Sequence, residues 1–190
     1  RSRVHGTGVF IDTHASPKAR YKAVGQGLFV RPGQRPHRIA GMYSADGLKW
    51  TRLPKPIIDV FADSQYSGFW DASRKRYVVY GRVGGRGRSL GRSESADFAR
   101  LEPLKLVAQT SDRDPPHSDL YNSAALKYAH APNVYLMFPS LFQHGPDTLD
   151  IRLAVSRDGI RWSRPDRKTA FIALGKGNVF DSGSLYMGQG

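Results

Sequence analysis

The chain has 190 residues, of which 39% are hydrophobic, and a formal net charge of +13. It contains no cysteine, which excludes disulfides and cysteine-ligated metals, and no segment approaches the roughly 18 apolar residues of a membrane span. The basic residues are spread along the chain, mostly in turns such as 73–76 and 164–168. We interpret them as a solvated surface and expect neither nucleic acid nor a membrane as a partner.

The N-terminal third of the chain predicts four strands in succession. A segment at 4–11 is followed by a strand that opens with Tyr21, and a third strand ends in the turn Ser44-Ala45-Asp46-Gly47. An outer strand carrying Trp50 completes the unit. Asp and Gly in such a turn predict a hairpin, because Asp bonds nearby backbone and Gly accepts positive φ. We expect Asp46 to hold the turn and to have no role in chemistry.

The same order of signals recurs twice further along the chain. Strands open with Tyr77 and Tyr135, which follow Tyr21 at nearly equal intervals. The Ser-x-Asp turn recurs at Asp97 and Asp158, in step with the tyrosines, and the last copy ends in Trp162. The interval is close to the length of one propeller blade, and four-stranded units repeated in phase are typical of such blades.

We therefore predict an all-β fold, a β-propeller of the five-bladed type present as a fragment of about three blades of four antiparallel strands. The repeat units run over about 4–62, 63–118 and 119–180, with the start of a fourth at 181–190. An unpaired strand is expected near 181–188, and little helix anywhere. A β-sandwich is the rival architecture, but it does not explain three signals that repeat in phase.

Three aspartates stand where an inner strand is predicted to begin. Asp63, Asp119 and Asp181 are spaced like the repeat itself. Inner strands line the channel of a propeller, so these carboxylates would converge on one pocket. Glycoside hydrolysis needs such convergence, because one carboxylate acts as nucleophile or base and another group protonates the leaving oxygen. The alternative is that each Asp bonds only the backbone of its own blade.

Other residues near these positions are candidates for the site. Glu94 either reaches the pocket as a further catalytic carboxylate or pairs with Arg92, and the sequence leaves both open. No metal-ligand spacing links the six histidines, and no Lys-Ser/Thr pair follows the run 84–87, which we predict to be a hairpin. We expect neither a metal nor a cofactor. The candidate substrate-binding residues are His5, Trp70, Arg92, His117 and Tyr121.

Two features of the sequence resemble the five-bladed propellers of glycoside hydrolase families 32, 43 and 68, in an uncharacterised bacterial branch. They are the inner-strand Asp segments and the run Ser-Arg-Asp-Gly-Ile-Arg-Trp at 156–162. The resemblance spans nearly the whole chain, although such turns also resemble the Asp-boxes of sialidases. It implies that Asp63 and Asp119 take the two Asp roles of those enzymes. Asp181 occupies the place of their acid Glu, so the acid could be Glu94, Asp181 or a residue outside the chain.

The resemblance implies a protein that hydrolyses glycosidic bonds in a plant or microbial polysaccharide or oligosaccharide. We expect a carbohydrate substrate and a secreted or periplasmic protein. The Asn-Asp-Pro, Arg-Asp-Pro and Glu-Cys signatures of those families are absent, which favours a non-catalytic carbohydrate-binding propeller as the alternative. A sialidase-like enzyme is a further alternative, and it would need three Arg for the substrate carboxylate.

Overall fold

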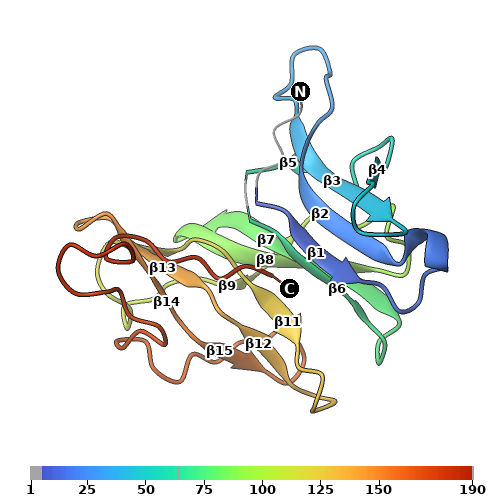
Figure 1. Cartoon of the computed structure of the whole chain (residues 1–190). Helices are drawn as coiled ribbons and strands as arrows, with labels where there is room; N and C mark the ends of the chain where they lie inside the picture. The colour runs from blue at the N-terminus through green and yellow to red at the C-terminus, as the bar shows by residue number, and fades with distance from the viewer. Residues whose placement is uncertain (1–5, 64, 190) are drawn as a thin grey trace. The chain divides into compact units, whose positions relative to one another are not determined.

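The computed structural model describes residues 6–63 and 65–189. Strands dominate these ranges, and a short 3₁₀ turn lies at Pro17–Ala19 (Figure 1). Among the described residues, no helix is long and apolar enough to cross a membrane. The predicted all-β class is confirmed. Internal contacts divide the chain into two compact units, 1–81 with 92–105 and 189–190, and 82–91 with 106–188.

The first sheet contains the strands of the first predicted repeat. It has the antiparallel order β1-β2-β3-β4, and β5 also pairs with β3. Pro54 and Pro56 separate β4 from β5, and proline has no N–H to donate to a ladder. The predicted fourth strand is therefore present as two pieces on one edge of β3. The strands are β1 (Gly8–Ile11), β2 (Tyr21–Leu28), β3 (His37–Ser44), β4 (Thr51–Arg52) and β5 (Ile58–Phe61).

The second sheet has four strands in the order β6-β7-β8-β9. The tip of its β7–β8 hairpin belongs to the second unit, whereas β6 belongs to the first. Glu102 lies before the outer strand β9 and is exposed, so it is not part of that strand. The strands are β6 (Ser67–Asp71), β7 (Arg76–Gly85), β8 (Gly87–Ser95) and β9 (Lys105–Ala108).

The third repeat is a meander of three long strands, each interrupted near its middle. Two three-stranded sheets result, with the orders β10-β13-β14 and β11-β12-β15. At the break, Asn122 Oδ1 accepts a hydrogen bond from the Ser140 N–H at 2.7 Å, and Ala124 has φ +40°. The strands are β10 (Ser118–Leu120), β11 (Ala125–Lys127), β12 (Tyr135–Met137), β13 (Ser140–Gln143), β14 (Thr148–Ile151) and β15 (Ala154–Ser156).

The outer edge of the third repeat is irregular, and the strand predicted near 181–188 is not formed. Isolated bridges join Val155 to Ser163 and Ile151 to Ile172 in place of a fourth strand. In the described part of the 181–188 segment, a single parallel bridge joins Ser184 to Leu149. Glycines at 183 and 188 weaken strand formation there. The prediction of an unpaired inner strand is therefore wrong.

The repeated signals of the sequence occupy equivalent structural positions. Tyr21, Tyr77 and Tyr135 each pair with the end of the preceding inner strand, opposite Ile11, Trp70 and Lys127 respectively. This equivalence was predicted from the spacing of the tyrosines, and the register confirms it.

The complete Ser-x-Asp-Gly-x-x-Trp turns have the same hydrogen bonds in both copies. Asp46 Oδ1 accepts from the N–H groups of residues 48 and 49 at 2.9 and 2.8 Å, and Asp158 Oδ1 accepts from those of 160 and 161 at 2.8 and 2.7 Å. Each Trp indole donates to the glycine carbonyl of its own turn, at 2.9 and 3.2 Å. The predicted structural role of these aspartates is confirmed.

The first unit contains a contiguous apolar core. Side chains from both of its sheets contribute, and the fully buried members include Val24 and Ile58. Beside it, the buried carboxylate of Asp12 accepts a hydrogen bond from the Tyr77 hydroxyl at 2.8 Å and pairs with Lys22 Nζ at 3.2 Å. The second unit buries Leu120, Met137, Leu141, Leu149 and Ile151 in its broken meander.

Candidate functional site

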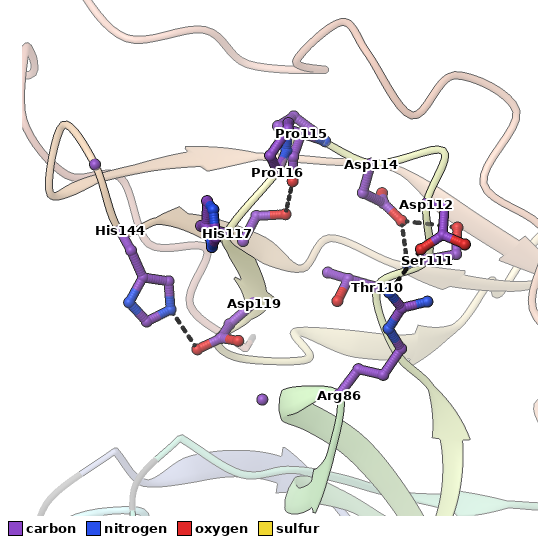
Figure 2. A pocket seen from close by; sticks show the side chains of 13 residues that line it. Arg86, Thr110, Ser111, Asp112, Asp114, Pro115, Pro116, His117, Asp119 and His144 are labelled. Carbon is purple, nitrogen blue, oxygen red and sulfur yellow. Dashed lines mark hydrogen bonds and ion pairs between the residues drawn. The ribbon is translucent and has the colours of Figure 1, made fainter.

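A pocket of about 1060 Å³ lies within the second unit (Figure 2). Three segments form it: the tip of the β7–β8 hairpin at Arg86 and Gly87, the segment 110–119, and the β13–β14 hairpin at His144 and Gly145. The pocket carries carboxylate, guanidinium and imidazole groups. It therefore brings several kinds of polar group together within one unit.

Asp119 is the buried carboxylate of this pocket. It lies in the middle of β10, opposite Phe142 of β13, and is 5% exposed. Its Oδ2 atom accepts a hydrogen bond from the Arg88 guanidinium at 2.9 Å and lies 2.9 Å from His144 Nε2. Figure 2 shows the imidazole edge directed at the carboxylate. The two partners fix the carboxylate through one oxygen.

Gly87 makes room for the carboxylate. It has φ +68°, and a Cβ atom at this position would overlap Asp119 Oδ1. Both the backbone conformation and the close approach therefore require glycine. The hairpin predicted at 84–87 is confirmed, and its last glycine has a second purpose, which is to admit Asp119.

His117 lies in the same pocket in an uncommon backbone conformation. Its φ is +52°, in the left-handed region that is sparsely populated by residues other than glycine. Its carbonyl accepts a hydrogen bond from the His144 N–H at 3.0 Å. The two loops that carry the histidines are therefore tied together. The prediction that His117 contacts substrate stays a prediction.

The other wall of the pocket contains a second buried carboxylate, Asp114. Arg164 binds it in bidentate fashion, at 2.5 and 2.7 Å, and Arg167 Nη1 lies 3.1 Å from Oδ2. Burial alone would raise the Asp114 pKa, but hydrogen bonds from Arg164 and the Ser111 N–H, with the charges of both arginines, lower it. Asp114 is thus a structural anchor whose ionised form is favoured.

A second buried arginine, Arg152, lies near this cluster. Arg152 binds Asp150 at 2.5 and 2.8 Å and donates to the Arg167 carbonyl at 3.0 Å. The arginines that gather here are thus committed to carboxylates of the chain itself. They do not form the open triad that a sialidase-like site would need.

Two arginine side chains pack on the ring of Tyr121, near Asp119. The Arg82 guanidinium lies 4.1 Å from the ring centroid, and Arg88 lies 5.3 Å from the rings of both Tyr121 and Phe142. The ring also meets Tyr186 edge-on at 5.8 Å. Cation–π contacts of this kind stabilise the arginine positions. The predicted role of Tyr121 in sugar binding stays a prediction, and its observed role is to support Arg88.

Two other aromatic and basic candidates lie in the first unit. Trp70 stacks on His14 at a centroid distance of 4.3 Å and contacts Tyr77 at 4.7 Å. Arg92 Nη2 pairs with Glu94 Oε2 at 2.6 Å. Of the two alternatives left open for Glu94, the structure shows the pair with Arg92.

The predicted set of catalytic carboxylates is divided between the units. Asp63 and Glu94 belong to the first, and Asp119 and Asp181 to the second. Asp63 is exposed and lies shortly before β6, and Asp181 lies in a turn against Gly175, outside the set of residues that line the pocket. Their convergence stays a prediction. His5 lies outside the described residues.

Sequence reasoning missed Arg88, His144 and Asp114. Arg88 sits in a basic hairpin and His144 in a polar turn, and nothing in their local sequence distinguishes them from solvated residues. Their importance comes from strand register, which places β13 beside β10. Among the described residues, no group of three or more His, Asp or Glu side chains is arranged to hold a metal ion.

No protein-family model and no curated protein sequence matches the chain. Solved structures do resemble it. One is a glycoside hydrolase, with a TM-score of 0.65, 16% identity, and coverage of 90% of this chain and 55% of that one. Another is the family 32 β-fructofuranosidase of Bombyx mori, with a TM-score of 0.59, 12% identity, and coverage of 86% and 35%.

A third similar structure is the N-acetylgalactosamine deacetylase of F. plautii, with a TM-score of 0.53, 13% identity, and coverage of 97% of this chain and 75% of that one. At these identities the likeness shows the fold alone. The chain spans about half the length of the glycoside hydrolase that it matches. Together with the repeated antiparallel meanders, the comparisons identify the fold as a partial β-propeller, of a kind found among glycoside hydrolases.

Proposed function

We propose that this chain is part of an exported, glycoside hydrolase-like protein that binds a plant or microbial oligosaccharide or polysaccharide in the pocket at Asp119. The observation that carries the proposal is a buried carboxylate in a large polar pocket, held by an arginine and a histidine. Most glycoside hydrolases act through carboxyl groups at the site of bond cleavage. Fold neighbours that are glycoside hydrolases support the proposal at the level of the fold.

The pocket has groups suited to sugar hydroxyls. Asp119 Oδ1 is a carboxylate oxygen beside the wall at Gly87, and Thr110, Ser111 and His117 add further polar groups to the lining. A pyranose or furanose ring presents donors and acceptors on every side, so a pocket with both kinds of group fits it better than an apolar one does.

A non-catalytic carbohydrate-binding protein is the second candidate. It is favoured by the ion pairs of all three pocket carboxylates, since Asp112 pairs with Arg86, Asp114 with Arg164, and Asp119 with Arg88. A carboxylate that is already paired is less able to act as a nucleophile or base, which favours binding over turnover. Binding without turnover would then be the activity of this pocket.

The test combines a binding assay with a turnover assay. The full chain is screened against polysaccharides and aryl glycosides, and bound sugars are measured by calorimetry. If the proposal is correct, Asp119→Asn cuts kcat by two to four orders of magnitude, as loss of a catalytic carboxylate does. Asp59→Asn is the matched control, because Asp59 is half-exposed in an ion pair of the first unit.

The outcomes separate the two candidates. Hydrolysis that Asp119→Asn abolishes supports the hydrolase. Sugar binding by the wild type with no hydrolysis of any substrate selects the binding protein. Unchanged turnover in Asp119→Asn would remove Asp119 from the site.

A further inference from the structure

His144 is held in a fixed orientation at the edge of the pocket. Its Nε2 lies 2.9 Å from Asp119 Oδ2, its main-chain N–H donates to the His117 carbonyl at 3.0 Å, and its ring lies 4.6 Å from that of Phe142. Its side chain is still 47% exposed. In the described part of the chain, no hydrogen bond is formed by Nδ1 of this ring. One nitrogen is therefore anchored, and the other is available.

We propose that His144 is the proton-transferring group of this pocket and that Asp119 orients it; the inference rests on the proposed hydrolase function. An ionised Asp119 requires the proton of the His144 ring to be on Nε2. Nδ1 is then the basic atom of the neutral ring and the second N–H of the charged one. A buried carboxylate that fixes the tautomer and stabilises the imidazolium is how histidine is prepared for proton transfer.

The arrangement supplies a proton donor within the pocket itself. Glu94 is paired with Arg92 in the first unit, and Asp181 lies outside the pocket lining. In the proposed step, His144 Nδ1–H gives its proton to the glycosidic oxygen while the bond from that oxygen to the anomeric carbon breaks. The bonding electrons stay on the oxygen, water attacks the carbon and loses a proton to solvent, and His144 regains its proton from solvent.

The charged and titratable groups that face the ring come from several elements. Asp119 on β10 and Arg88 on β8 meet at Oδ2 of Asp119, the atom that His144 Nε2 also contacts. His117 is the titratable side chain of the adjoining loop, and Asp147 follows in the hairpin of His144 itself.

The principal test is His144→Gln. A glutamine amide can still donate to Asp119, but it cannot transfer a proton. We expect kcat to fall by two to four orders of magnitude, with sugar affinity by calorimetry within about twofold of wild type. The wild-type pH–rate profile should have a limb at about pH 6–7, where imidazole groups titrate. The profile of the variant should lack this limb. Added imidazole should restore part of the turnover of His144→Ala.

The control is His130→Gln, since His130 is exposed in the β11–β12 turn and does not line the pocket. Wild-type turnover in His144→Gln, or reduced turnover with an unchanged pH–rate profile, would overturn the assignment and leave the hydrolase proposal standing. A wild-type protein that binds sugar and hydrolyses none would overturn both.

Discussion

The two buried aspartates of the pocket differ in how they are held. The difference distinguishes a carboxylate with a structural role from one that is a candidate for chemistry. Asp114 is bound through both oxygens by Arg164, with Arg167 behind, and Arg164 is itself 7% exposed. Asp119 is bound through one oxygen by Arg88 and His144, whose side chains are 38% and 47% exposed. Arginines thus bind both oxygens of Asp114, whereas neither Arg88 nor His144 binds the Oδ1 atom of Asp119.

The largest expected effect is on the Asp114 side. Asp114→Asn leaves the buried Arg164 without its counter-charge, and we expect a loss of about 3–5 kcal/mol in the free energy of unfolding. Urea denaturation would measure it. Asp112→Asn is the matched control, since the nearby Asp112 side chain is 89% exposed. Equal stabilities of the two variants would show that Asp114 is not the anchor.

A smaller effect is expected from Gly87→Ala. The added methyl group meets Asp119 Oδ1 and forces an alanine into positive φ, which should cost about 2 kcal/mol. The same change should also alter sugar binding, because the carboxylate must move. Gly84→Ala is the control, since a Cβ at Gly84 would meet no atom within 4 Å. If both variants melt alike, the close approach at Gly87 has no energetic importance.

Asp119→Asn should change stability by only about 1 kcal/mol, because its partners are partly exposed and solvent screens the pair. The variant is therefore expected to lose turnover while it keeps its fold. Thermal unfolding and circular dichroism would check this. A loss as large as that of Asp114→Asn would mean that Asp119 is also an anchor.

The last prediction concerns pH. The lowered Asp114 pKa means that its contribution to stability is fully present above about pH 4, the ordinary range of an Asp. The contribution is lost as pH falls through the folded-state pKa. The stability difference between wild type and Asp114→Asn should therefore shrink in acid, as denaturation at neutral pH and at about pH 3, below the ordinary Asp range, would show. A difference that stays constant would exclude ionic anchoring.

Much of the fold could be predicted from sequence because its signals are local. The tyrosines that open the second strands and the Ser-x-Asp-Gly turns depend on residues a few positions apart, and both lie where expected. The split of the first outer strand at Pro54 and Pro56 also has a local cause. The segment at 181–188 was misjudged because strand formation depends on a neighbouring strand as well as on pattern.

The site was less predictable for the same reason. Asp119 was identified from the repeat, but Arg88 reaches it from β8 and His144 from the β13–β14 turn, and their spacing in sequence carries no information about this meeting. Asp114 looks like one of many turn aspartates until Arg164, far along the chain, is seen to bind it. Long-range pairs of this kind follow from register, which a single sequence does not specify.

The two complete Ser-x-Asp-Gly-x-x-Trp turns have a consequence for how such a chain could have grown. The hydrogen bonds that close the turn join residues of the motif itself, from its Ser to its Trp. The turn thus carries its own closing hydrogen bonds in its sequence. A duplicated stretch of gene therefore also encodes the hydrogen bonds that close its turn. The copy can form this turn before its other surfaces have adapted to new neighbours.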